Sequence, residues 1–280
     1  SIGNYSAPGG KMKKKELLKH EGIPVKEDKV IKLENFLWKA SNMRIFPFLQ
    51  SLKKLQDYLS SIAEESLNEK IASIDYTASC DVAYIEQLPE IAISACVLFK
   101  GLKEAKPMSI SISILPIFFP YIPGFLAFRE AIPLLSALHA LIAETKKIPN
   151  LIFVDGHGIL HPRNFGIASH IGVLLHCPVI GIAKSLLVGK VDSRSKKYHG
   201  DRIYYPVYLR RKICGYCIER KNRKIYVSPG AHIGLSESLK IALKLRWGSR
   251  KVPDIMALPH DFVTLLRKKI HEISLFLKKE

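Results

Sequence analysis

Three acidic residues stand out by their positions. Asp75 lies within the predicted strand 71–76, Glu130 stands beside the start of a predicted helix, and Asp155 directly follows an apolar run. Carboxylates that converge in a fold can bind a hard cation such as Mg²⁺, which takes oxygen ligands and is typically shared with substrate phosphate. Such a cation can activate water for hydrolysis at phosphorus. Each acid singly also fits a capping or ion-paired role, so the spacing leaves both interpretations open.

Asp155 belongs to a predicted βαβ unit. The run 151–154 is wholly apolar, as in a strand buried on both faces. Residues 167–175 carry apolar side chains at helical spacing, and 178–183 form a second apolar strand that ends at Lys184. Because such a crossover makes the two strands parallel, Asp155 and Lys184 should emerge at the same edge, where open α/β sheets bind their ligands.

The other expected elements surround this unit. They are a helix over 47–63, strands over 71–76, 91–99 and 109–119, a helix from Pro133, strands within 204–217 and 224–227, and helices over 236–246 and 262–277. Three successive strands predict an antiparallel meander before the βαβ unit. The fold class is therefore α/β, with a mixed sheet flanked by helices. We expect one domain over 46–280, preceded by a basic extension over 1–45 that is either a solvated tail or a nucleic-acid arm.

The net charge of +18 is concentrated toward the end of the chain. Residues 1–50 hold ten Lys and Arg against five acids, residues 51–183 hold ten against twelve, and residues 184–280 hold twenty-three against eight. A strongly basic last third favours nucleic acid or another polyanion as the partner. A soluble, lysine-rich surface has the same composition, so charge alone does not decide.

Cysteines and histidines give weaker signals. Three of the five cysteines lie inside apolar runs, which indicates a reducing compartment, and we expect a cytoplasmic protein, or a nuclear one in a eukaryote. Cys214 and Cys217 form a lone CxxC without a second ligand pair for zinc. His157 and His161 have the spacing of a zinc pair on a helix, but the glycines and Pro162 predict a loop. The uncharged stretch 107–128 contains four prolines and is not expected to span a membrane.

Several segments, taken together, resemble the endonuclease V family. They are Asp75, Pro120-Tyr121-Ile122-Pro123-Gly124, Phe128-Arg129-Glu130, Val154-Asp155-Gly156-His157-Gly158, His161-Pro162-Arg163, Gly166-Ile167-Ala168-Ser169-His170 and Gly181-Ile182-Ala183-Lys184, in the family's order and spacing. The similarity extends from about residue 47 to the end. It implies a ribonuclease H-like fold and a Mg²⁺-dependent endonuclease, with Mn²⁺ able to substitute. The implied reaction cleaves the second phosphodiester 3′ of inosine in DNA or RNA and leaves a 3′-hydroxyl and a 5′-phosphate.

The resemblance also implies residue roles. Asp75, Glu130 and Asp155 would be the metal ligands, and Lys184 would stabilise charge at the scissile phosphate. Tyr121 would be a wedge that fills the space left by an extruded base. The other expected substrate-binding residues are Pro120, Ile122, Pro123, Gly124, Gly156, Gly158, His161, Arg163, Gly166 and Leu187. The family's Ser-x-Gly-His run corresponds here to Ser228-Pro229-Gly230-Ala231-His232, so His232 takes the catalytic histidine's role only through a one-residue shift.

We therefore expect a monomeric endonuclease that binds nucleic acid and no membrane. The alternative is a nucleic-acid-binding protein that keeps the fold but cleaves weakly, which the altered histidine run supports. The sequence does not choose between DNA and RNA, because that choice depends on contacts around a 2′-hydroxyl.

Overall fold

The computed structural model describes residues 10–20, 22–31, 46–85, 90–102 and 106–277. The chain divides into two compact units, residues 1–53 and 54–280. The first unit contains helix α1 (Gly10–His20) and a hairpin of strands β1 (Val25–Lys26) and β2 (Lys29–Val30). Asp28, in the hairpin turn, forms ion pairs with Lys11 and Lys15 of α1. These ion pairs join the hairpin to the helix.

The second unit is built around one mixed sheet. Helix α3 (Phe46–Glu65) leads into it, followed by the short helix η2 (Ser66–Asn68). The strands are β3 (Tyr76–Ile85), β4 (Glu90–Lys100), β5 (Pro107–Ile117), β6 (Leu151–Asp155), β7 (Val179–Ala183), β8 (Lys190–Val191), β9 (Lys197–His199), β10 (Arg202–Leu209), β11 (Lys212–Arg220) and β12 (Arg223–Ala231). The helices are α4 (Leu126–Thr145), α5 (Ile167–Leu175), α6 (Leu235–Lys244) and α7 (Asp254–Leu277).

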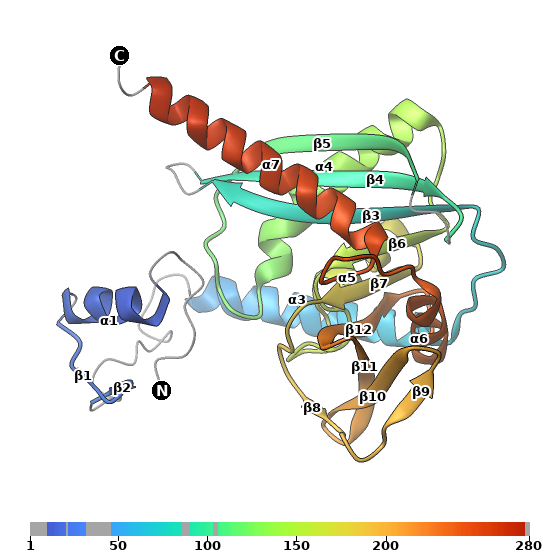
Figure 1. Ribbon diagram of the computed structural model, residues 1–280, viewed down its shortest axis with the longest axis horizontal. Coiled ribbons are helices and arrows are strands. Elements are labelled where there is room, and N and C mark those ends of the chain that lie inside the picture. Colours follow the sequence, from blue (N-terminus) through green and yellow to red (C-terminus); the bar gives the residue numbers. More distant parts are fainter. Residues whose placement is uncertain (1–9, 21, 32–45, 86–89, 103–105, 278–280) are drawn as a thin grey trace. The chain divides into compact units, whose positions relative to one another are not determined.

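Within the described residues, the strands of this unit follow the order β5-β4-β3-β6-β7-β12-β11-β10-β8, with β9 paired to β10 (Figure 1). The neighbours β3, β6 and β7 are parallel, and the strands on either side pair antiparallel. This order confirms the predicted fold class, an antiparallel meander followed by a parallel βαβ unit.

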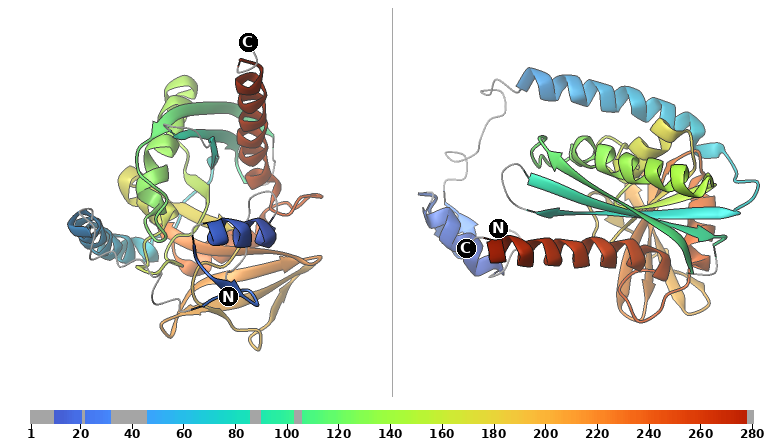
Figure 2. Two further views of the ribbon diagram at one scale, coloured as in Figure 1. Left: turned by 90° about the vertical axis from the view of Figure 1, so that its left-hand side faces the viewer. Right: turned by 90° about the horizontal axis from the view of Figure 1, so that it is seen from above.

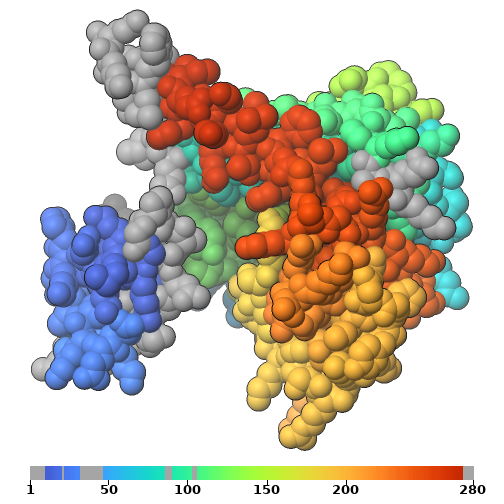
Figure 3. All heavy atoms as spheres, in the orientation of Figure 1, coloured from blue at the N-terminus to red at the C-terminus, as the bar shows by residue number. Residues whose placement is uncertain are grey.

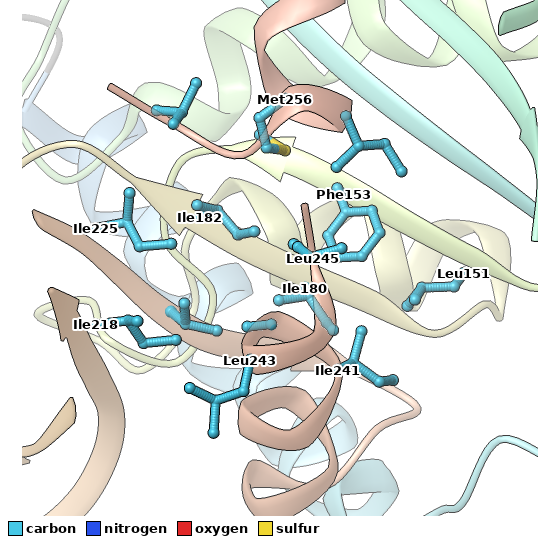
Figure 4. Close-up of a cluster of buried hydrophobic side chains, with 14 of the residues drawn as sticks. Leu151, Phe153, Ile180, Ile182, Ile218, Ile225, Ile241, Leu243, Leu245 and Met256 are labelled. Atoms are coloured by element: carbon cyan, nitrogen blue, oxygen red, sulfur yellow. The ribbon is translucent and has the colours of Figure 1, made fainter. Parts of the chain in front are cut away.

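Helices cover both faces of the sheet. Helices α4 and α5 pack on one face, and α6 and α7 pack on the other (Figure 2). Strand β6 shows the alternation that this requires: Ile152 and Val154 face α4 and α5, whereas Leu151 and Phe153 join α6 and the start of α7 in a second cluster (Figure 4). Burial on both faces explains why 151–154 contains no polar residue.

Two surface features complete the unit. Helix α4 is long and apolar enough to cross a membrane by length and composition, but half of that apolar window is buried against the sheet. Helix α7 lies along β3 and β4, with its outer side at the surface (Figure 3). Both helices therefore cover the hydrophobic core of a folded unit.

The predicted first strand, 71–76, is wrong. The strand β3 begins at Tyr76, and residues 71–75 form a loop from which Ile71 and Ile74 pack against the core. Their apolar side chains gave the loop the pattern of a strand. The true strand buries small polar groups such as Ser79 in the middle of the sheet, so its apolar pattern is weak.

Two helix boundaries also differ from prediction. Helix α7 starts at Asp254 and not at Phe262, and it continues through Pro259, a residue that normally disfavours a helix interior. Helix α4 starts before Glu130, so Pro133 is an interior residue and not a first-turn residue. Both differences move a chemically important residue, His260 or Glu130, onto a regular helix.

Candidate active site

Two aspartates meet on neighbouring parallel strands. Cys80 of β3 pairs with Val154 of β6, so the residues that follow them, Asp81 and Asp155, lie side by side. His260 reaches the same point from α7. One potential ligand atom from each of these three residues lies within 4.8 Å of the others. We call Asp81, Asp155 and His260 the acidic cluster.

Short polar contacts order the acidic cluster. His260 Nδ1 lies 2.7 Å from Asp81 Oδ2, and the other Asp81 oxygen accepts a hydrogen bond from the Val82 amide at 2.8 Å. Lys184 Nζ donates to Asp155 Oδ2 at 2.7 Å and lies 3.3 Å from His260 Nδ1. The structure therefore brings Asp155 and Lys184 to one edge, where they form an ion pair.

Glu130 approaches this cluster from helix α4. It is buried, and its Oε1 accepts a hydrogen bond from the Tyr84 hydroxyl at 2.7 Å. Burial raises the pKa of Glu130 to about 7, and the neighbouring charges of Asp81 and Asp155 add to the rise. Burial and Asp81 also raise the pKa of Asp155, while Lys184 opposes the rise. Three carboxylates thus share one poorly solvated region.

The donor set fits a divalent cation. Asp81, Asp155 and Glu130 supply hard oxygen atoms and His260 supplies an imidazole nitrogen, a combination that suits Mg²⁺ or Mn²⁺. Burial and then repulsion between like charges raise the pKa values of Glu130 and Asp155, and a bound cation would relieve that repulsion. When bound, such an ion supplies Lewis-acid polarisation of a phosphate and a more acidic water.

A pocket of about 410 Å³ opens beside the acidic cluster. It is lined by Tyr121, Pro123, Gly124, Leu126, Ala127, Asp155, Gly156, His157, His161, Gly166, Ile167, Ala183, Lys184, Ser185, Leu186 and Leu187. Most predicted substrate-binding residues are in this set. Asp155 belongs to both the acidic cluster and the pocket, and Lys184, which forms an ion pair with Asp155, also lines the pocket, so the two form one continuous site.

Two segments contribute residues to the pocket wall, and we call them the wedge turn (120–124) and the base loop (156–166) after the roles that the family resemblance implies for them. In the wedge turn, Tyr121 lies between Pro120 and Pro123, and its side chain is 67% exposed. In the base loop, a Cβ on Gly158 would lie 1.9 Å from the Pro229 carbonyl oxygen, and one on Gly166 would lie 2.2 Å from the His157 oxygen. These two glycines let backbone pack against backbone.

Arg163 contacts protein groups and does not line the pocket. Its Nε donates to Gln56 Oε1 at 2.7 Å, its Nη2 donates to the Gly124 carbonyl, and its guanidinium stacks 4.4 Å from the centre of the Phe125 ring. These contacts tie the base loop to the wedge turn. Pro120, Ile122 and Gly158 are also absent from the pocket lining.

Asp75 does not join the other acids. It precedes β3, is exposed, and its side chain accepts a hydrogen bond from Ser73 Oγ at 3.3 Å. Its amide donates to Asn150 Oδ1 at 3.0 Å, just before β6 begins. Six residues of extended chain separate it from Asp81, or roughly 20 Å. Asp75 therefore lies at the opposite ends of the parallel strands from Asp155. Asp81 occupies the position beside Asp155 that was predicted for Asp75.

His232 is also remote from the acidic cluster. It follows β12, whose last residue, Ala231, pairs with Val179 at the start of β7. Asp155 lies beside the other end of β7, next to Ile182. The His232 ring instead lies 3.0 Å from Glu69 Oε1 and packs on the His176 ring at 4.1 Å between centroids. The histidine near the acids is His260, and the one-residue shift is unnecessary.

Sequence reasoning missed Asp81, His260 and Gln56. A usable signal existed for Asp81, because it is the only acid in the run 76–85 and a lone carboxylate inside a strand is conspicuous once that strand is located. His260 carried no such signal, since the predicted helix began two residues after it. Gln56 lies in an amphipathic helix, where a glutamine normally indicates an exposed position.

A mixed sheet of this order, with Asp81 inside β3 beside Asp155 at the end of the adjacent strand β6, is the arrangement of a ribonuclease H-like, metal-dependent hydrolase. The family model described as Endonuclease V matches residues 56–260. The chain belongs to the endonuclease V family, and the protein is a nuclease.

Individual relatives agree. The chain is 35% identical to an endonuclease V from Gloeobacter violaceus over 207 residues, covering 72% of this chain and 80% of the relative. The endonuclease V structure from Streptomyces avermitilis superposes with a TM-score of 0.68 at 25% identity, covering 79% of this chain and 94% of that one. The fold is also similar to Ciona intestinalis endonuclease V, solved with a 24mer DNA containing an inosine followed by a ribo-adenosine (TM-score 0.66, 21% identity, 80% and 99% coverage).

Proposed function

We propose that this protein cleaves nucleic acid at inosine in a Mg²⁺-dependent reaction, with Mn²⁺ able to substitute. Cleavage falls at the second phosphodiester bond 3′ of the inosine and leaves a 3′-hydroxyl and a 5′-phosphate. The observation that carries the proposal is the continuity of the pocket with the acidic cluster through Asp155 and Lys184. When a base is bound in the pocket, the nucleic acid strand that carries it passes beside the acidic cluster.

The pocket suits a flipped, neutral base. Its wall combines backbone of Gly156 and Gly166 with the buried imidazoles of His157 and His161. Burial lowers the pKa of His161 to about 4, so this ring is uncharged at neutral pH and can hydrogen-bond a base edge without attracting phosphate. Tyr121 fills the gap that the extruded base leaves in the stack.

The groups in and around the acidic cluster have separate roles in hydrolysis. Asp81, Asp155, Glu130 and His260 would hold the cation. Lys184, whose ammonium is half-exposed beside Asp155, stabilises the negative charge that develops on the scissile phosphate. The hydrogen bond from the Tyr84 hydroxyl holds the carboxylate of Glu130 in place. The weakly cleaving alternative loses its main support, because His260 supplies a histidine beside the acids.

The remaining expectations form part of this proposal. The partner is inosine-containing DNA or RNA, bound by a monomer. All five cysteines are free thiols, which supports a reducing compartment such as the cytoplasm, or the nucleus of a eukaryote.

The test uses oligonucleotides with one inosine, prepared as DNA and as RNA, beside matched strands with guanine at the same position. With Mg²⁺ we expect one nick 3′ of inosine, and with chelator none. Asp155→Ala should bind the inosine strand without cutting it. Equal cutting of inosine and guanine strands, or cutting that persists in chelator, would contradict the proposal. The relative rates of the DNA and RNA strands identify the preferred substrate.

A further inference from the structure

Gln56 is a fully buried polar residue between the two walls of the pocket. Its side chain is 0% exposed. Nε2 lies 3.3 Å from the Gly124 carbonyl oxygen, 3.4 Å from the Phe165 carbonyl oxygen and 3.4 Å from His170 Nε2. Oε1 accepts the hydrogen bond from Arg163 Nε at 2.7 Å. A single amide group therefore contacts the wedge turn and the base loop at the same time.

The surrounding groups allow only one orientation of this amide. Two backbone carbonyl oxygens face Nε2, so a flipped amide would place oxygen against oxygen. The Arg163 guanidinium faces Oε1 and can only donate. A buried amide that is left without hydrogen-bond partners destabilises the folded state, so removing the partners of Gln56 is unfavourable.

The contact at Gly124 is reinforced from the base loop. Arg163 donates to the same carbonyl oxygen that Gln56 Nε2 contacts. Gly124 has a φ of +82°, and a Cβ there would lie 2.9 Å from Arg163 Nη2, so this turn accepts glycine alone without strain. Gln56 and Arg163 together fix the end of the wedge turn three residues after Tyr121.

We infer that Gln56 is a positioning residue for base recognition: it holds the wedge turn and the base loop at a fixed separation. Tyr121 then enters the stack at the point from which the displaced base reaches the pocket. Gln56 is itself part of neither the acidic cluster nor the pocket lining, and it contacts the lining at Gly124, so it acts through the residues that it holds in place. This inference rests on the proposed function and adds a determinant of specificity to it.

The test replaces Gln56 by methionine, which has similar length and no hydrogen-bonding amide. Affinities are measured for an inosine strand and its guanine counterpart, without divalent metal so that no cleavage occurs, and well below each variant's melting temperature. A 2-aminopurine beside the inosine reports unstacking by fluorescence. We expect Gln56→Met to lower the inosine-to-guanine affinity ratio about tenfold, which equals about 1.4 kcal/mol. Binding of the guanine strand and of Mn²⁺ should not change.

Gln50→Met is the matched control, because Gln50 is exposed on the same helix. It should behave as the parent. If Gln56→Met does not fold, Arg163→Lys provides the second test, since it keeps the charge and removes the Nε donor to Gln56. A folded Gln56→Met or Arg163→Lys with the parent's affinity ratio and fluorescence overturns the inference. A parent that does not prefer inosine instead overturns the proposed function.

Discussion

The position of a carboxylate in the chain decides at which end of the parallel strands its side chain lies. Asp81 and Asp75 are six residues apart, yet only Asp81 lies beside Asp155 and His260. Asp75 hydrogen-bonds to a serine and to Asn150 in the connection before β6. Of the two acids, only Asp81 is buried among like charges, where a cation has something to neutralise.

Replacing Asp81 by asparagine should abolish metal-dependent cleavage. The amide keeps the shape but removes one of the negative charges that bind the cation, so we expect cleavage to fall more than about 100-fold and Mn²⁺ to bind more weakly. Cleavage assays and a Mn²⁺ titration measure the two effects. Asp75→Asn is the matched control and should stay within about twofold of the parent. The opposite ranking of the two variants would restore Asp75 to the site.

His170 should make the folded state sensitive to acid. Burial, assisted by the charges of His161 and Arg163, lowers its pKa to about 3, below the value of 6.5 for an unperturbed histidine. Between these values the unfolded chain binds the extra proton, so stability falls as the pH falls below 6.5. From pH 7 to pH 5 the loss is about 2 kcal/mol for this residue.

Urea unfolding of the parent and of His170→Asn at pH 7 and pH 5 measures this contribution. The variant should lose about 2 kcal/mol less than the parent between the two pH values, because asparagine does not titrate. Comparing the two proteins cancels the effect of other groups, such as Glu130. Equal losses in parent and variant would show that His170 titrates normally in the folded protein.

At the level of elements, the site combines paired strands with two loops, the wedge turn and the base loop. Strands β6 and β7 present Asp155 and Lys184 from backbone that is paired on both sides. The wedge turn leaves the edge strand β5 through Phe118, which is 83% exposed, and carries Tyr121 at its tip. Arg129 donates from α4 to the Phe119 carbonyl at 2.7 Å and anchors the start of this turn. Both ends of the wedge turn are therefore held by buried or half-buried polar side chains.

Tyr121→Ala tests the wedge turn directly. Loss of an aromatic ring that stacks in the nucleic acid should weaken inosine-strand binding by about tenfold, since base stacking on an aromatic residue is worth about 1–3 kcal/mol. Phe118→Ala is the control, because it removes an exposed aromatic ring three residues earlier. Binding is measured by fluorescence anisotropy. Similar affinities for Tyr121→Ala and the parent would remove Tyr121 from base extrusion.

The elements that sequence could predict are those with one dominant signal. The run 151–154, the helix 167–175 and the strand 178–183 are apolar and bounded by glycine or proline, so the βαβ unit and the Asp155–Lys184 adjacency followed from topology. Strand β3 buries Thr77, Ser79 and Asp81 against neighbours distant in sequence, and no local pattern reveals that. Gln56 is hidden for the same reason, because its partners are 68 to 114 residues away.

On the scale of the whole unit, the basic charge extends beyond the pocket. The tip of the β10–β11 hairpin carries Arg210, Arg211 and Lys212, and Lys190 of β8 lies beside it around an open surface depression. Arg210 donates to the Pro162 carbonyl at 2.8 Å, so this tip adjoins the base loop. A nucleic acid strand that enters the pocket therefore meets positive charge on the side of the base loop.

Arg211→Ala should weaken binding of inosine and guanine strands by the same factor. A phosphate contact carries no base information, so the inosine-to-guanine ratio should be unchanged while the slope of log affinity against log salt falls by about one. Lys100→Ala is the control, since Lys100 lies beside Asp75 at the opposite edge of the sheet. A salt slope equal to that of the parent would show that no phosphate reaches the hairpin tip.

The acidic cluster is completed late in the synthesis of the chain. Its residues are spread along the chain from Asp81 to His260, and His260 follows every strand of the sheet in sequence. A chain that has not yet been synthesised as far as α7 lacks His260 and cannot assemble the complete cation-binding set. The cation site should therefore be completed only after α7 has packed against β3 and β4.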